Sequence, residues 1–284
     1  MKRMIPWLLT GALALTAMAA GAATGEVAGA GASAALTVQQ ILDRHVAARG
    51  GADAWRKIQS MGWTGRIESG AGGISKTPFL MLFRRPDATR FEVMAQGQRS
   101  VRVFDGSKGW KMIPTASGVP DVKEYSEEEI RFARDAVGLD GPLFDPKAKG
   151  VKVRLLGMDS VDGHRAYHLK VTLPSGQMRD EWIDAHSFLE LRYDRESHTV
   201  AGATVVVSVY LRNYQAFEGL LIPLTIETGG ASVQNTDKMI IEKIALNPEV
   251  NDSQFARPTI PVQRHTGVVV DTRPTGAAGP ASKP

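Results

Sequence analysis

The sequence predicts a mostly antiparallel β fold with a few helices. From residue 151 to residue 246, apolar and polar side chains alternate along successive short runs, which is the period of a strand with one covered face. Turn-forming residues separate these runs, among them Asp162-Gly163 and Glu218-Gly219. The alternation gathers the apolar side chains on one face of a meander, so other parts of the chain must cover that face.

Further strands are predicted in the N-terminal half. Met61 and Trp63 begin an alternating run, whereas residues 79–83 read Phe-Leu-Met-Leu-Phe and are apolar on both faces. A strand of the second kind needs cover on both sides of the sheet. Shorter alternating runs follow around residues 91–93, 101–103 and 110–112.

Capping signals mark helices between these strands. Thr37 and Gln40 form a capping box, in which each side chain bonds the other residue's backbone N–H, and a helix follows it. A short second helix is expected over about residues 52–59. Ser126 and Glu129 form another capping box, which predicts a third helix immediately after Ser126.

The N-terminus has the pattern of an export signal. Two basic residues precede an alanine-rich apolar run that ends near Ala20, and small residues suited to cleavage follow it. An uncleaved membrane anchor is the weaker alternative, because Pro6 and Gly11 interrupt the run. We expect cleavage after residue 22, or as late as residue 32. The expected organisation is a signal peptide (1–22), a flexible lead-in (23–35), a single β domain (36–256) and a disordered Pro/Gly/Ala-rich tail (257–284).

Composition excludes several classes of function. The chain of 284 residues has no cysteine, which rules out disulfides, zinc–thiolate sites, thiol catalysis and lipoprotein acylation. Lys2 and Arg3 leave with the signal peptide, so the formal net charge of +4 falls by two to +2. No basic cluster stands beside aromatic residues, so we expect no nucleic-acid partner.

Two motifs suggest cofactor or metal chemistry, and a simpler explanation fits each better. Residues 70–77 nearly spell a phosphate-binding loop, but Ser75 stands where the glycine before the lysine belongs, and the loop joins two strands. His164 and His168 are four residues apart, which on a strand is a separation of ~13 Å. We therefore expect neither a cofactor nor a bound metal.

Acidic residues cluster at Asp180, Glu181 and Asp184. Strand alternation puts Glu181 on the face opposite the two aspartates, as in a solvated strand. The chain has no Gly-x-Ser-x-Gly elbow, and no serine has a base near it in the sequence. We therefore expect that the protein is not an enzyme, with a hydrolase built from residues distant in sequence as an alternative.

An excess of large apolar side chains in the N-terminal half suggests a cavity. A curved sheet that helices close only in part could leave an apolar cavity, whereas a packed core is the alternative explanation. The helix over about residues 127–137 would be the lid, because weakly held elements are the ones that move. The candidate cavity residues are Trp63, Phe79, Met81, Phe83, Phe91, Val93, Val103 and Trp110.

Short motifs in a fixed order extend over residues 36–258. They are Ile41-Leu42-Asp43, Ala48-Arg49-Gly50-Gly51, Trp63-Thr64-Gly65, Arg85-Pro86-Asp87, Phe104-Asp105-Gly106, Gly109-Trp110, Tyr167-His168-Leu169, Tyr214, Pro223 and residues 247–255. In this order and spacing the chain resembles the periplasmic lipoprotein-sorting carriers, the relatives of the outer-membrane lipoprotein carrier LolA. The resemblance implies a curved, incomplete antiparallel β-barrel, with helices as a lid over an apolar cavity that holds acyl chains.

The resemblance also implies a function. It indicates a periplasmic, monomeric carrier whose cargo is a lipid or an acylated protein, with a transfer partner at the inner or outer membrane. The cysteine that anchors the receptor-type relative is missing from this chain. The alternative from another class is an envelope sensor or scaffold that binds a protein partner.

Overall fold

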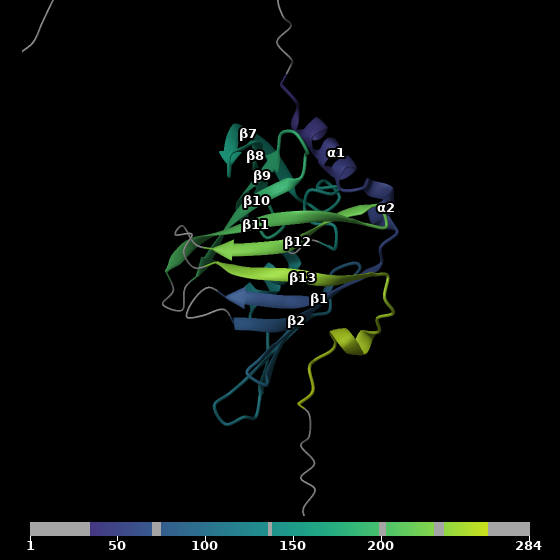
Figure 1. Ribbon diagram of the computed structural model, residues 1–284. Helices are drawn as coiled ribbons and strands as arrows, with labels where there is room; N and C mark the ends of the chain where they lie inside the picture. Colours follow the sequence, from purple (N-terminus) through teal and green to yellow (C-terminus); the bar gives the residue numbers. More distant parts are fainter. Residues whose placement is uncertain (1–34, 70–74, 136–137, 199–202, 230–235, 261–284) are drawn as a thin grey trace, which may run out of the picture. The chain divides into compact units, whose positions relative to one another are not determined.

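A computed structural model describes residues 35–69, 75–135, 138–198, 203–229 and 236–260 (Figure 1). The expected signal peptide, nearly all of the lead-in, the turn at residues 70–73 and most of the expected tail lie outside these ranges. Within them, the chain forms one antiparallel sheet together with three α-helices and one 3₁₀ turn.

The first helix, α1 (Val38–Ala48), begins at its predicted capping box. The Gln40 N–H donates to Thr37 Oγ1 (3.3 Å), and the Thr37 N–H donates to Gln40 Oε1 (2.9 Å). Just after its other end, Gly50 lies against the turn at Glu218-Gly219, where a Cβ on Gly50 would stand 2.2 Å from the Gly219 carbonyl oxygen. A side chain at this position would clash with that carbonyl, so glycine is required immediately after the helix.

The second helix, α2 (Ala52–Arg56), is shorter than predicted, since the sequence pattern extended it to about residue 59. The side-chain oxygen of Asn247 accepts a hydrogen bond from the Gln59 N–H (2.7 Å), and its amide donates to the Lys57 carbonyl (3.3 Å). These bonds take the place of another helical turn and lead the chain into the first strand.

The third helix, α3 (Glu127–Asp135), also begins at its predicted capping box. The Glu129 N–H donates to Ser126 Oγ (3.2 Å), and the Ser126 N–H donates to Glu129 Oε2 (3.0 Å). Three glutamates in its first turn interact favourably with the positive, N-terminal end of the helix dipole. Across the described ranges, no helix is long and apolar enough to cross a membrane.

The described residues form a sheet of 13 strands in the order β6-β5-β4-β3-β2-β1-β13-β12-β11-β10-β9-β8-β7. The first six, β1 to β6, are Ser60–Ser69, Ser75–Arg84, Ala88–Ala95, Gln98–Phe104, Gly109–Ile113 and Asp121–Glu124. The other seven, β7 to β13, are Lys152–Val161, His164–Thr172, Met178–Asp184, Glu190–His198, Thr204–Phe217, Leu220–Gly229 and Asp237–Leu246.

Two meanders make up this sheet and join at its centre (Figure 1). The chain passes from β1 outward to β6, crosses through α3 and residues 138–150 to the other edge at β7, and returns strand by strand to β13. There β13 pairs with β1, with Trp63 opposite Ile244. Because β6 and β7 are not neighbours, the sheet is open, which confirms the predicted incomplete barrel and the long meander over residues 151–246.

Different elements pack on the two faces of the sheet. On one, which we call the helix face, α1 packs on β7–β9 and α2 packs on β1 and β12. On the other, which we call the outer face, the 3₁₀ turn Asp252–Phe255 buries Phe255 against Leu82 and Val103. Residues 79–83 are therefore covered on both sides, as their two-sided apolar pattern predicted.

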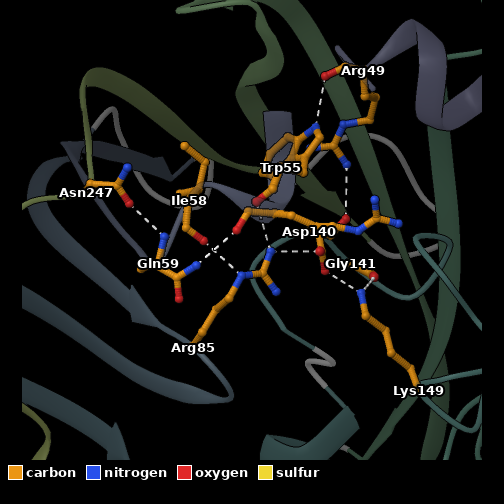
Figure 2. A network of polar contacts seen from close by, with 10 residues as sticks. Arg49, Trp55, Ile58, Gln59, Arg85, Asp140, Gly141, Lys149 and Asn247 are labelled. Atoms are coloured by element: carbon orange, nitrogen blue, oxygen red, sulfur yellow. Dashed lines mark hydrogen bonds and ion pairs between the residues drawn. The ribbon is translucent and has the colours of Figure 1, made fainter. Parts of the chain in front are cut away.

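A polar network fastens the crossing segment, residues 138–150, to its surroundings (Figure 2). Its centre is the Asp140 carboxylate, which is only 10% exposed and accepts hydrogen bonds from two cations. Arg85, in the turn between β2 and β3, donates through Nη2 (2.9 Å). Lys149, at the far end of the crossing segment, donates through Nζ. One carboxylate thus joins the two ends of the segment to the sheet.

The same two cations also bind backbone carbonyls. Arg85 donates to the carbonyls of Ile58 (2.8 Å) and Trp55 (3.1 Å), which connects the segment to α2. Burial by itself would raise the pKa of Asp140, but the hydrogen bonds from Lys149 and Arg85 outweigh it and hold that pKa below its ordinary value. Burial also lowers the pKa of Lys149, and Asp140 offsets only part of that cost.

Candidate functional site

An apolar pocket opens on the helix face beneath α3. Its volume is about 480 Å³, within the roughly 300–1,000 Å³ of ligand pockets in proteins. Apolar residues make up most of its lining, with a few polar residues at one end. The lining residues are Trp63, Met81, Phe83, Thr89, Phe91, Arg102, Tyr125, Glu129, Phe132, Ala133, Ile226 and Met239.

Strand pairing explains why the apolar side chains meet. Trp63 on β1 lies directly opposite Met81 on β2, which lies directly opposite Phe91 on β3. Opposite residues of an antiparallel pair share a face, so these three side chains form a continuous row, which we call the pocket floor. Phe83 packs edge-on against Trp63, with ring centroids 4.8 Å apart.

The helix α3 supplies the wall above the floor through Phe132 and Ala133. Phe132 keeps 40% of its surface exposed. Of the described α3 residues, only Asp135 is fully buried. The helix thus buries little apolar surface, and the Asp135 carboxylate at its end accepts hydrogen bonds from the Ser175 N–H and hydroxyl.

The polar end of the pocket holds Arg102 and Glu129, and Lys111 lies beside them in contact with Glu129. Glu129 of α3 accepts hydrogen bonds from Lys111 Nζ at 2.7 Å to each oxygen, and from Arg102 Nη1 at 3.3 Å. Burial would raise the pKa of Glu129, but the hydrogen bonds from Lys111 and the Ser126 N–H reverse the effect and lower it. These contacts attach the first turn of α3 to β4 and β5.

Tyr125 closes the polar end, and a glycine makes room for it. A Cβ on Gly109 would stand 2.0 Å from a carbon of the Tyr125 ring, so the ring packs flat on the backbone of β5. Burial raises the pKa of the Tyr125 hydroxyl, although Arg102 acts to lower it through its charge and a hydrogen bond.

The structure divides the eight cavity candidates into three groups. Trp63, Met81, Phe83 and Phe91 line the pocket. Phe79 and Val93 lie on the same face, opposite each other, one step further along the strands and outside the lining; Phe79 is buried with its ring centroid 6.2 Å from that of Phe91. The last two candidates, Val103 and Trp110, are opposite each other on the outer face, in the cluster around Phe255.

Sequence reasoning missed the contribution of the second meander. Ile226 on β12 and Met239 on β13 lie opposite each other and line the pocket from the far side of β1. The pairing of β1 with β13 brings them there, and nothing local in the sequence predicts that pairing. Arg102 could have been found, because alternation along β4 places it on the face opposite Val101 and Val103.

A second group of polar side chains is buried on the helix face, away from the pocket. Glu181 on β9 is fully buried and accepts a hydrogen bond from Arg179 (2.5 Å), which corrects the expectation of a solvated strand. The Arg179 guanidinium lies 4.4 Å from the centre of the Tyr193 ring. We call these residues, together with Glu190 on β10, the buried acid cluster.

Two oxygens in the buried acid cluster have no hydrogen-bond partner among the described residues, Oε2 of Glu181 and Oε1 of Glu190. Glu190 faces Ile183 across the strand pair, and Ile183 lies two residues along β9 from Glu181, so the two carboxyl groups share a face. Burial, reinforced by the charge of Glu181, raises the pKa of Glu190 from 4.5 to about 8. Glu190 is therefore mainly protonated at neutral pH.

Three of the described histidines, His45, His164 and His168, have local partners. His164 contacts Asp184 (3.2 Å), while His168 contacts Asp180 (2.9 Å) and stacks on Trp182. Burial and the neighbouring Arg49 lower the pKa of His45 to about 3, so it is neutral and donates from Nδ1 to a backbone carbonyl. Over the part of the chain that the structure describes, no three His, Asp or Glu residues gather as a metal site.

Comparison with known proteins identifies the fold. No protein-family model and no curated protein matches the sequence. A LolA superfamily protein from Nitrosomonas europaea superposes with a TM-score of 0.53 at 15% identity, covering 78% of this chain and 99% of that one. A DUF1329 family protein from Desulfovibrio piger superposes with a TM-score of 0.51 at 14% identity, covering 77% and 97%. The chain has a LolA-like fold, as the sequence resemblance predicted.

Proposed function

We propose that this protein is an exported carrier that shields an acyl chain, of a lipid or an acylated protein, in the pocket beneath α3. The observation that carries the proposal is the pocket itself, an apolar space of about 480 Å³ with an aromatic floor and, above it, a helix that buries little apolar surface. Burying an alkyl chain on such a surface contributes about 0.8 kcal/mol per methylene. A solvent-filled apolar pocket of this size is otherwise an unfavourable feature in a soluble domain.

The lining supports a carrier rather than a rigid receptor. Met81 and Met239 have flexible side chains that adapt to chains of different length and branching. The lid helix is attached at its first turn through Glu129 and at its last through Asp135, which accepts hydrogen bonds from the Ser175 N–H and hydroxyl, and it covers the pocket with two apolar residues. Opening it therefore breaks these polar attachments and exposes little apolar surface. Release of cargo to a partner at the inner or outer membrane needs such a lid.

Export is the first testable part of the proposal. The mature protein should be found in the periplasm and should begin between residues 24 and 35, because the basic and apolar start of the chain is a cleavable signal. N-terminal sequencing of protein recovered from separated periplasm and cytoplasm measures this directly. A protein that keeps Met1 and stays in the cytoplasm would contradict it.

Occupying the pocket should abolish binding with little cost in stability. Ala133→Phe adds a ring to the wall formed by α3, where the pocket has space for it. We expect the free energy of unfolding to change by less than about 1 kcal/mol, while the affinity for a fluorescent fatty acid falls by at least about tenfold. Thermal denaturation and fluorescence titration measure the two effects.

The matched control is the same substitution on the outer face. Ala88 is buried in the cluster around Phe255, so Ala88→Phe should overpack that core and cost about 1–3 kcal/mol. Binding per folded molecule should stay at the wild-type value. Wild-type affinity in Ala133→Phe, with the fold intact, would show that the acyl chain does not occupy this pocket.

Native mass spectrometry of gently purified protein separates this proposal from its alternatives. Co-purified lipid or acylated protein supports carriage. A stoichiometric protein partner without lipid would instead support a sensor or scaffold. Turnover of an ester substrate, abolished by a single substitution, would support a hydrolase.

A further inference from the structure

Cations line up at one end of the pocket. The row of opposite residues that forms the pocket floor continues past Phe91 to Arg102 on β4. Lys111 on β5 lies opposite Arg102, and Lys123 on β6 lies opposite Lys111. Like charges placed directly opposite each other on neighbouring strands destabilise a sheet, so this row needs anionic partners on the same face.

Two carboxylates contact this row of cations. Asp121 pairs with Lys123 (2.9 Å), and Glu129 pairs with both Arg102 and Lys111. One carboxylate, Glu129, thus serves both cations beside the apolar floor. Lys111 is only 21% exposed, so water and salt screen its charge less than they screen an ordinary surface lysine.

We infer that the pocket selects an amphiphile with one anionic headgroup, which Arg102 and Lys111 bind while the acyl chain lies along the floor. This inference rests on the proposed function, in which the pocket holds an acyl chain. A carboxylate or phosphate headgroup would give both cations the charge-assisted hydrogen bonds that they now share through Glu129. The row of residues runs from the apolar floor to the two cations, and such a ligand runs in the same way from its acyl chain to its anionic headgroup.

Binding of the headgroup would also act on the lid. Glu129 attaches the first turn of α3 to β4 and β5 through the same two cations. An anion that takes these cations replaces that attachment, so headgroup binding and loosening of α3 are coupled at one pair of side chains. Glu129 therefore competes with the headgroup for the two cations. For this reason we expect substitutions of Lys111 and Glu129 to change the affinity for an anionic ligand in opposite directions.

The test compares palmitate with palmitamide, which has the same chain and no charge. We expect wild-type protein to bind palmitate about tenfold more tightly, the scale of one charge-assisted hydrogen bond. Lys111→Gln should bring palmitate down to the affinity of palmitamide and leave palmitamide unchanged. Glu129→Gln should tighten palmitate by a similar factor, because glutamine still serves in the capping box with Ser126 while its competition for the cations is gone.

Each outcome separates the inference from the proposed function. If palmitate and palmitamide bind equally well, and neither variant changes their ratio, the pocket holds chains without reading the headgroup, and this inference fails alone. If neither ligand binds, the proposed function fails. Inorganic phosphate is the third probe: displacement of palmitate by phosphate at concentrations close to those of palmitate itself would mean that the cations bind free anions, and would overturn the inference.

Discussion

Glu190→Gln is expected to make the protein more stable than wild type by about 4 kcal/mol at about pH 9, with little difference near pH 4. The Glu190 carboxyl is buried, one of its oxygens has no partner among the described residues, and Glu181 lies beside it. Ionising it inside the protein adds a buried charge that Arg179 and Arg49 offset only in part, whereas glutamine keeps a neutral group of the same shape.

The direction of the pH dependence follows from proton binding. The pKa of Glu190 is about 8 in the folded protein, against 4.5 for an ordinary glutamate. Between these two values the folded state holds a proton that the unfolded state has lost, so wild-type stability falls as the pH rises through the window. Each unit of displacement is about 1.4 kcal/mol, so the displacement of about 3.5 units between 4.5 and 8 gives about 4–5 kcal/mol.

Urea denaturation at several pH values measures this effect. Glu196 is an exposed glutamate on the same strand, and Glu196→Gln should shift stability by less than about 0.5 kcal/mol at any pH. Parallel stability curves for wild type and Glu190→Gln from pH 4 to pH 9 would mean that Glu190 ionises in the fold without penalty. The buried acid cluster would then hold an additional cationic or donor group.

Most of the fold could be predicted from the sequence because its signals are local. Alternation over residues 151–246 and the capping boxes at Thr37 and Ser126 depend on neighbours within a few positions, and the structure has both. The end of α2 could not be predicted in the same way. It depends on Asn247, which is far away in the chain and lies beside Gln59 because β13 pairs with β1.

The site was less predictable because it depends on which face a residue occupies. In a sheet covered on both sides, an apolar residue gives no sign of its face, and a shift of one position exchanges the two faces. Val103 and Arg102 are adjacent, yet the first packs in the outer cluster and the second reaches the pocket. For the same reason Glu181 looked like a solvated residue, although the helix face buries it.

The crossing segment should depend strongly on its central carboxylate. Asp140→Asn removes the charge that compensates Arg85 and Lys149 while it preserves the shape of the side chain. Breaking a buried ion pair from one side costs about 3–5 kcal/mol, and because these cations are about one-fifth exposed we expect about 2–3 kcal/mol at neutral pH. Equilibrium denaturation measures the loss.

The same substitution should matter less in acid. The pKa of Asp140 is lower in the folded protein than the ordinary value of 3.8, so its contribution is complete above that pH and disappears as the pH falls through the folded value. The difference between wild type and Asp140→Asn should therefore shrink below about pH 4. Asp145→Asn is the matched control, because Asp145 lies exposed in the same segment with a backbone conformation (φ 47°) that asparagine tolerates well.

The Asp140→Asn substitution should also affect the proposed lid, α3. Residues 138–150 follow α3 in the chain, and Asp140 joins their two ends to Arg85 beside α2 (Figure 2). Loosening the segment in Asp140→Asn should let α3 open more often, so backbone amides of α3 should exchange hydrogen faster while those of α1 keep their protection. A global loss of protection, equal in α1 and α3, would instead show that Asp140 stabilises the whole domain and has no particular hold on the lid.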